Sequence, residues 1–233
     1  MPHLNSVVDL SHHNVVTSFD EAKAAGILGV FHKATEGTIF VDARYDERRA
    51  PAKAAGLLWG AYHFGAHGDI KGQVRHFLDV ANPNPSDLLV LDFEPNSREG
   101  TMTLTEAEAF VEQVQQETGR FPGLYSGQSF LKEQLGKRTD TILKNCFLWI
   151  ARYSSKIPEV PPAFKDFDFW QYSDGNAGPQ PHQVPSIGRC DRDKYNGDEE
   201  SLRQLWGEET LAMKAPTLSR APKSSARATR RNR

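Results

Sequence analysis

Two copies of one seven-residue segment constrain the fold of this chain more than any other feature. Residues 22–28 read AKAAGIL and residues 52–58 read AKAAGLL, a spacing of 30 residues. In each copy an alanine-rich helical stretch meets a glycine, which tolerates the left-handed backbone that often ends a helix. An apolar run of the kind found in buried strands follows each glycine. Helix, glycine and strand at this period predict the βα unit of a parallel sheet.

The same alternation continues along the chain and predicts an α/β fold. We expect strands at 6–10, 28–33, 57–63, 88–94, 121–126, 147–151, 168–172 and 189–191. We expect helices at about 18–25, 44–55, 69–80, 103–118 and 127–135. Five strands are thus each followed by a helix, and three more are joined mainly by loops, which predicts a parallel barrel without helices in its last third. A doubly wound open sheet is the alternative, although no phosphate-binding glycine loop follows the first strand.

Charge divides the chain into an acidic body and a basic end. Residues 214–233 contain seven basic and no acidic residues, whereas the whole chain has 28 Lys and Arg against 30 Asp and Glu. We therefore expect one folded domain over 1–213 and a basic, disordered tail over 214–233. The acidic body disfavours nucleic-acid binding by the domain, because phosphate contacts need clustered cations. The tail either tethers the protein to an anionic polymer or keeps it soluble.

Hydropathy bears on where the protein acts. No apolar run approaches the ~20 residues that span a bilayer, so we expect no membrane span. The first residues, MPHLNSVVDLSHHN, lack the basic and apolar regions of a signal peptide. We expect a monomer made in the cytoplasm.

Acidic residues recur where predicted strands end, which is where parallel α/β proteins place their active sites. Asp9 ends the first strand, Asp92 and Glu94 end the fourth, and Asp191 ends the last. Residues i and i+2 of a strand face the same side, so Asp92 and Glu94 form a carboxyl pair. Apolar neighbours and mutual repulsion should push the two pKa values apart, leaving one acid protonated and one charged. Glycosidic cleavage needs one carboxyl that donates a proton and a second that is ionised.

Aromatic residues near the same strand ends favour a saccharide ligand, because sugar rings stack on aromatic planes. They are Tyr62, Phe64, Tyr125, Trp149, Tyr153, Trp170 and Tyr172, of which Trp149 is better explained as core. Histidines at 12, 13, 63 and 67 raise the alternative of a metal-dependent hydrolase, but the chain has no HExxH motif and Gly65 interrupts the 63–67 spacing. We expect neither a metal nor a cofactor.

Eight segments of the chain resemble successive blocks of glycoside hydrolase family 25, the Chalaropsis-type lysozymes. They are VVDLSHHN, FHKATEGTIFVDARY, GAYHF, LLVLDFE, PGLYS, LWIARY, FWQYSDG and CDRDKYNGD, in the family's order over about 6–198. The resemblance implies a flattened, irregular TIM-like barrel of about five βα units followed by three strands. It also implies retaining cleavage of the β-1,4 bond between N-acetylmuramic acid and N-acetylglucosamine of bacterial cell-wall peptidoglycan.

By position, the resemblance assigns Glu94 as general acid/base and Asp92 as the second carboxylate, with Asp9 and Asp191 completing an acidic groove. Either a carboxylate attacks the anomeric carbon or the substrate's own acetamido group does, and we favour the second route because same-side carboxylates of one strand cannot flank the sugar. The matching blocks contain the expected saccharide contacts: Lys33, Glu36, Tyr62, Phe64, Tyr125, Trp170 and Tyr172. Lys33 and Glu36 could equally form a structural ion pair.

Two features depart from the family pattern. His12, His13 and Asn14 stand where many members carry Trp or Tyr followed by Gln, and no wall-binding repeat follows the body. A substrate outside the cytoplasm, without a signal peptide, requires release by lysis, a pore or a dedicated secretion system. A peptidoglycan-binding module that has lost turnover is the leading alternative function, and a metal-dependent phosphodiesterase is a second.

Overall fold

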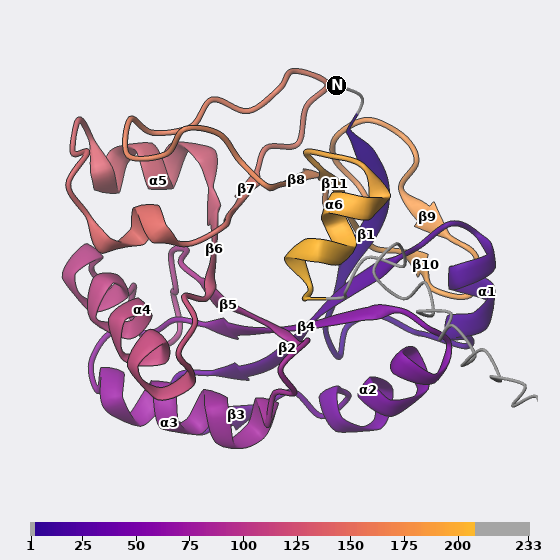
Figure 1. Cartoon of the computed structure of the whole chain (residues 1–233), viewed down its shortest axis with the longest axis horizontal. Helices are drawn as coiled ribbons and strands as arrows, with labels where there is room; N and C mark the ends of the chain where they lie inside the picture. The colour runs from indigo at the N-terminus through magenta and orange to yellow at the C-terminus, as the bar shows by residue number, and fades with distance from the viewer. Residues whose placement is uncertain (1–2, 208–233) are drawn as a thin grey trace, which may run out of the picture.

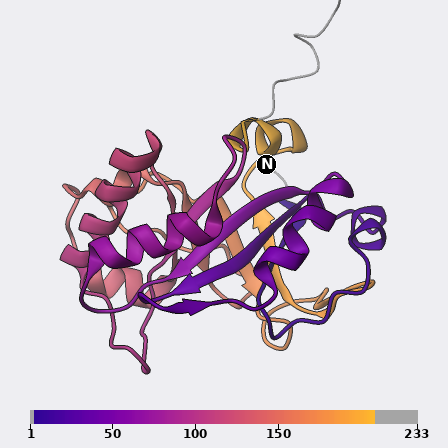
Figure 2. The ribbon, with the colours of Figure 1, turned by 90° about the horizontal axis from the view of Figure 1, so that it is seen from below.

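The computed structural model describes residues 3–207, which form a closed barrel (Figures 1 and 2). Strand β1 pairs on one side with β2 and on the other with β11, and this double pairing closes the sheet. In sheet order the barrel strands are β1 (Leu4–Leu10), β2 (Gly29–Glu36), β4 (Leu58–Phe64), β5 (Leu88–Asp92), β6 (Gly123–Gly127), β7 (Leu148–Ala151), β8 (Phe169–Ser173) and β11 (Asp191–Tyr195). The predicted barrel is confirmed, and the open-sheet alternative is wrong.

Within the described residues, helices cover the outside of the barrel over its first five strands, as the sequence predicts (Figure 1). They are α1 (Phe19–Ala24), α2 (Tyr45–Ala54), α3 (Ile70–Ala81), α4 (Leu104–Thr118) and α5 (Gln128–Leu135), followed by the 3-10 helix η1 (Ile142–Asn145). Short strands β3 (Phe40–Val41), β9 (Gln183–Val184) and β10 (Gly188–Arg189) lie outside the barrel circuit. The sequence prediction missed these strands and the last helix, α6 (Glu199–Leu205).

The repeated segment forms the same helix-to-strand turn twice. Gly26 and Gly56 follow α1 and α2 with φ of 94° and 77°, the left-handed region that a side chain disfavours. The Leu28 N–H then donates to Ser6 O at 2.7 Å, and the Leu58 N–H donates to Leu28 O at 2.8 Å. Each glycine thus reverses the chain so that the next apolar run joins the preceding strand in register.

The last barrel strand differs from the prediction. We expected a short strand over 189–191 that ends at Asp191, but β11 begins at Asp191 and runs antiparallel to both β1 and β8. Because its direction is reversed, the start of β11 lies beside the carboxyl end of β1, with Asp9 opposite Asp191 in the register. Asp191 therefore reaches the expected end of the barrel for a different reason.

The core has two layers. Outer faces of the strands pack against the helices, where α4 buries Ala107, Phe110, Val111 and Val114 as its helical spacing predicts. Inside the barrel, Phe31 stacks on Trp149 with ring centroids 4.6 Å apart. Helix α6 lies at the amino end of the barrel (Figure 2), where the Trp206 Nε1–H donates to Trp59 O at 2.9 Å. These contacts close the amino end and leave the carboxyl end for a site.

Two sequence predictions concern the limits of the described residues. The basic tail predicted over 214–233 lies outside them, as does the boundary predicted at 213. Within residues 3–207, no helix combines the length and hydropathy needed to cross a bilayer.

Candidate active site

A pocket at the carboxyl end of the barrel collects all four acids singled out in the sequence. Strands β1, β5 and β11, with the residues that follow β5, bring these carboxyls together although they are up to 182 positions apart in the chain. The pocket is lined by Asp9, Tyr62, Asp92, Glu94, Tyr125, Trp149, Tyr153, Gln171 and Asp191. Carboxyls and aromatic rings thus share one concave surface.

Hydrogen bonds to the backbone of Phe93 fix the Asp92–Glu94 pair. Strand β5 ends at Asp92, so Glu94 lies two residues beyond it. The Phe93 N–H nevertheless donates to Tyr125 O at 2.9 Å, and the Ser126 hydroxyl donates to Phe93 O at 2.7 Å. These bonds extend the alternation of the strand past its end, so Phe93 is buried in the outer core while both acids line the pocket.

Burial raises the pKa of each acid in the pocket. Desolvation and the charge of Asp191 raise the pKa of Glu94 to about 7. Desolvation and the neighbouring Glu94 raise the pKa of Asp92 well above its usual range, although the charge of Lys33 opposes the rise. The pKa of Asp191 is raised to about 6, chiefly by desolvation, and desolvation together with Asp191 raises that of Asp9. The site therefore holds protonated carboxyls near neutral pH.

From the sequence we expected the pKa values of Asp92 and Glu94 to be pushed apart, which would leave one acid protonated and one charged. The structure does not show that separation. Both rise, because burial desolvates each carboxyl and the charge of a neighbouring acid adds to the effect, Glu94 for Asp92 and Asp191 for Glu94. Lys33 lies near Asp92, but its ammonium is committed to Glu36 at 2.6 Å. Glu94 thus has a proton to donate near pH 7, and ionisation of Asp92 requires additional positive charge in the pocket.

Gln171 organises the aromatic wall of the pocket. Its Oε1 accepts hydrogen bonds from the Tyr125 hydroxyl at 2.8 Å and the Tyr153 hydroxyl at 3.0 Å, and its Nε2 donates to Asp9 Oδ2 at 2.7 Å. Tyr125 also packs edge-on against Trp149, with ring centroids 4.5 Å apart. Gln171 therefore couples the placement of two tyrosines to that of an acid.

The predicted saccharide contacts divide into residues that line the pocket, residues that form a layer beside it, and residues of β8 that face the outer core. Tyr62 and Tyr125 line the pocket. Lys33 and Glu36 form the ion pair that we considered as their structural role, and Lys33 lies over the Phe64 ring at 5.0 Å, so these three form a layer beside Asp92.

Trp170 and Tyr172 do not reach the pocket, contrary to the expectation from their position near a strand end. Both are buried in the outer core, where the Trp170 Nε1–H donates to Arg152 O at 2.8 Å. Alternation along β8 explains the difference, since Gln171 faces the pocket and its two neighbours must face away.

The histidines have structural partners. His63 is fully buried, with Nδ1 at 2.8 Å from Thr35 Oγ1 and Nε2 at 3.1 Å from Gln73 Oε1. His12 Nδ1 lies 2.8 Å from Asp42 Oδ2. In the part of the chain that the structure describes, no group of three or more His, Cys, Asp or Glu residues has the arrangement to hold a metal ion.

Sequence reasoning missed two groups at the floor of the site. Trp149 was assigned to the core, yet it is both buried and part of the pocket lining. Asp193 was not considered, although it accepts a hydrogen bond from Trp149 Nε1 at 2.7 Å. The spacing of Asp191 and Asp193 repeats the i, i+2 pattern of Asp92 and Glu94, and that pattern was the available signal.

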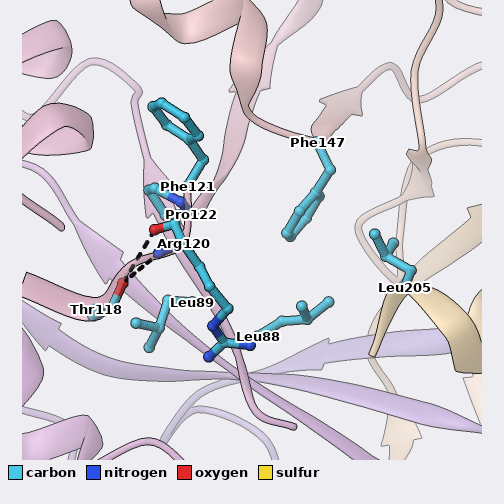
Figure 3. A pocket seen from close by; sticks show the side chains of 8 residues that line it. All are labelled: Leu88, Leu89, Thr118, Arg120, Phe121, Pro122, Phe147 and Leu205. Atoms are coloured by element: carbon cyan, nitrogen blue, oxygen red, sulfur yellow. Dashed lines mark hydrogen bonds between the residues drawn. The ribbon is translucent and has the colours of Figure 1, made fainter. Parts of the chain in front are cut away.

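A second depression lies toward the amino ends of the strands and has a different character (Figure 3). Its lining includes Leu88, Phe147 and Leu205, with Arg120 beside them. The Arg120 guanidinium donates to Pro85 O at 2.5 Å and to Asp87 O at 3.1 Å. Its N–H groups are therefore bound to backbone carbonyls of the loop before β5. Without a carboxyl in its lining, this depression offers no acid–base chemistry.

Protonatable carboxyls walled by aromatic rings, at the carboxyl end of a barrel, form the site of a glycoside hydrolase. The family model "Glycosyl hydrolases family 25" matches residues 8–180. The chain belongs to this family.

Similar proteins agree with this membership. Lysozyme M1 of Streptomyces globisporus is 29% identical over 212 residues, which cover 85% of this chain and 70% of that protein. N,O-diacetylmuramidase of Chalaropsis sp. is 27% identical over 185 residues, which cover 72% of this chain and 88% of that protein. The crystal structure of a bacterial lysozyme from Streptomyces coelicolor matches with a TM-score of 0.77 and 27% identity, covering 88% of this chain and 97% of that one. The family and the enzyme class predicted from the sequence are confirmed.

Proposed function

We propose that the protein is a muramidase that cleaves the β-1,4 bond between N-acetylmuramic acid and N-acetylglucosamine in peptidoglycan, with retention of configuration. The observation that carries the proposal is the gathering of Asp9, Asp92, Glu94 and Asp191 in one aromatic-walled pocket. Membership of family 25 and similarity to lysozymes support the choice of substrate.

In the first step, Glu94 acts as the general acid. Its carboxyl gives its proton to the glycosidic oxygen as the bond from that oxygen to the muramic acid C1 breaks, and the N-acetylglucosamine hydroxyl leaves. The raised pKa of about 7 suits this role, because an acid with a pKa near the working pH is both protonated and able to release its proton.

The acetamido oxygen of the muramic acid then forms a bond to C1, and Asp92 stabilises the positive charge that develops on the resulting ring. Developing positive charge favours the ionised form of Asp92, whose pKa is otherwise raised by burial. In the second step Glu94, now a carboxylate, takes a proton from water as that water attacks C1. The acetamido group is released, and Glu94 regains its proton. Two inversions at C1 give net retention.

A peptidoglycan-binding module without turnover is the alternative that the pocket itself argues against. A binder gains nothing from Glu94 at a pKa of about 7 in a site that desolvation makes costly to ionise. We further propose that the enzyme acts on the cell wall outside the cytoplasm, as a monomer, and that residues 1–213 contain its catalytic domain.

Digestion of purified peptidoglycan tests the proposal. The fragments are reduced with borohydride and identified by mass spectrometry, and we expect reduced muramic acid at the new ends. Reduced glucosamine at the new ends would mean that a different bond is cut. Absence of fragments from several wall types, while the protein still sediments with the walls, would favour the binding module.

A further inference from the structure

A second carboxyl pair lies at the floor of the site, and one of its members has no role in the reaction proposed above. Asp193 on β11 is fully buried, with none of its surface exposed. Its Oδ1 accepts the Trp149 Nε1–H at 2.7 Å, whereas its Oδ2 is buried without a hydrogen-bond partner. A buried carboxylate oxygen left without a hydrogen-bond partner is strongly unfavourable, so the arrangement needs an explanation.

The group nearest in kind is the carboxyl of Asp9. Asp9 lies opposite Asp191 in the β1–β11 register, which makes Asp193 its diagonal neighbour on the same face. The two side chains lie within hydrogen-bonding reach of each other. Asp9 Oδ2 already accepts a hydrogen bond from Gln171 Nε2 at 2.7 Å, so one oxygen of the Asp9 carboxyl is paired with a donor.

Two carboxylates cannot face each other in such a place, because each would be desolvated and would repel the other. A proton between them removes both problems, since it turns one oxygen into a donor for the other. Burial is complete for Asp193 and slightly less so for Asp9, which retains 6% exposure. Both members are therefore too deeply buried to ionise together, and the pair shares one proton.

We propose that Asp193 is a positioning residue whose Oδ2 shares one proton with the carboxyl of Asp9 while its Oδ1 holds the Trp149 indole. Through these two bonds it fixes the floor of the pocket and leaves the pair with one negative charge where two would otherwise stand. No bond to substrate is formed by Asp193. Its effect on catalysis rests on the proposed function, but its protonation state does not.

Infrared spectroscopy of Asp193→Asn tests the assignment without any substrate. Near neutral pH, we expect the variant to lose the intensity of one protonated-carboxyl carbonyl band relative to the wild type. Asp79→Asn is the matched control, because Asp79 is exposed on α3 and its loss should leave that band unchanged. Equal bands in the wild type and in Asp193→Asn would overturn the proposal.

The pH profile of hydrolysis supplies a second readout. The titratable and charged groups facing the pair are Tyr62, Asp92, Tyr125, Tyr153, Tyr172, Cys190, Asp191 and Arg192. Because the pair carries one negative charge, Asp193→Asn leaves that charge on Asp9, so the midpoint of the basic limb should not shift even where kcat falls. A downward shift of that midpoint would show that a negative charge had been removed and would overturn the proposal.

A second variant keeps the proposal testable if Asp193→Asn fails to fold. Glu94, with a pKa of about 7, and Asp191, with a pKa of about 6, are ionised well above neutral pH. Asp92→Asn removes the other pocket acid whose pKa is raised well above its usual range. In Asp92→Asn well above neutral pH we expect a protonated-carboxyl band to persist, and its absence would overturn the assignment. A wild type that cleaves no glycan, when Asp92→Asn shows the band, would refute the proposed function and leave the shared proton standing.

Discussion

Replacing Glu94 by glutamine should abolish hydrolysis and at the same time stabilise the protein above neutral pH. Glutamine keeps the size of the side chain but has no proton to give. General acid–base catalysis by one side chain contributes about 10²–10⁴-fold to rate, so we expect kcat to fall by at least about 10²-fold. The gain in stability follows from the pKa of the group that is removed.

The magnitude comes from the difference between the folded and unfolded pKa values of Glu94. Its pKa is about 7 in the folded protein and 4.5 ordinarily. Below pH 4.5 the carboxyl is protonated in both states and has no pH-dependent effect. As the pH rises through 4.5 and on to about 7, the unfolded chain ionises while the folded protein resists, so the wild type loses stability. At about 1.36 kcal/mol per pKa unit the loss reaches about 3 kcal/mol.

Glu94→Gln has no such titration and should escape this loss. We therefore expect its advantage in free energy of unfolding over the wild type to grow by about 3 kcal/mol between pH 4 and pH 8. Because about 1 kcal/mol shifts the Tm of a domain of this size by about 2–4 °C, the Tm difference should widen by about 6–12 °C.

Denaturant unfolding of both proteins at a series of pH values measures this difference, and digestion of peptidoglycan measures the activity. Glu112→Gln is a control, since Glu112 is exposed on α4, outside the pocket lining, and should not reproduce the effect. A variant whose advantage does not grow with pH would refute the raised pKa of Glu94. A variant that retains full activity would refute its role as general acid.

Three further predictions concern the wall of the pocket, the core and the alternative chemistry. Gln171→Leu removes the acceptor of two tyrosine hydroxyls and a donor to Asp9, so KM for soluble glycan should rise about tenfold or more while far-UV circular dichroism is unchanged. Phe110→Ala should lower the free energy of unfolding by about 3–5 kcal/mol in denaturant titration, because its ring is fully buried between α4 and the barrel. Treatment with EDTA should leave hydrolysis unchanged, and loss of activity restored by a divalent metal would favour the phosphodiesterase alternative.

Much of the fold follows from the sequence because the constraints are local. Glycine after each alanine-rich helix and the length of each apolar run predict five βα units, and the structure has them at nearly the predicted residues. The four pocket acids are predictable for a related reason, since parallel strands place their carboxyl ends together and each acid lies at or near such an end.

The sequence by itself thus determined which segments are strands, in what order they alternate with helices, and which carboxyls meet at one end. Only the tertiary structure decided which face of each strand looks inward. The period of two groups Trp170 with Tyr172 and separates both from Gln171, but it does not say which set faces the pocket. That choice depends on packing against distant strands.

The direction of β11 was likewise decided by tertiary structure, because it depends on the path of the long segment that connects it to β8. Its reversal puts Asp191 opposite Asp9 and brings Asp193 beneath them, where burial sets the protonation of the whole cluster. A pKa is a property of surroundings assembled from several strands. The sequence can therefore name the acids of this site, but the folded barrel decides which of them carry protons.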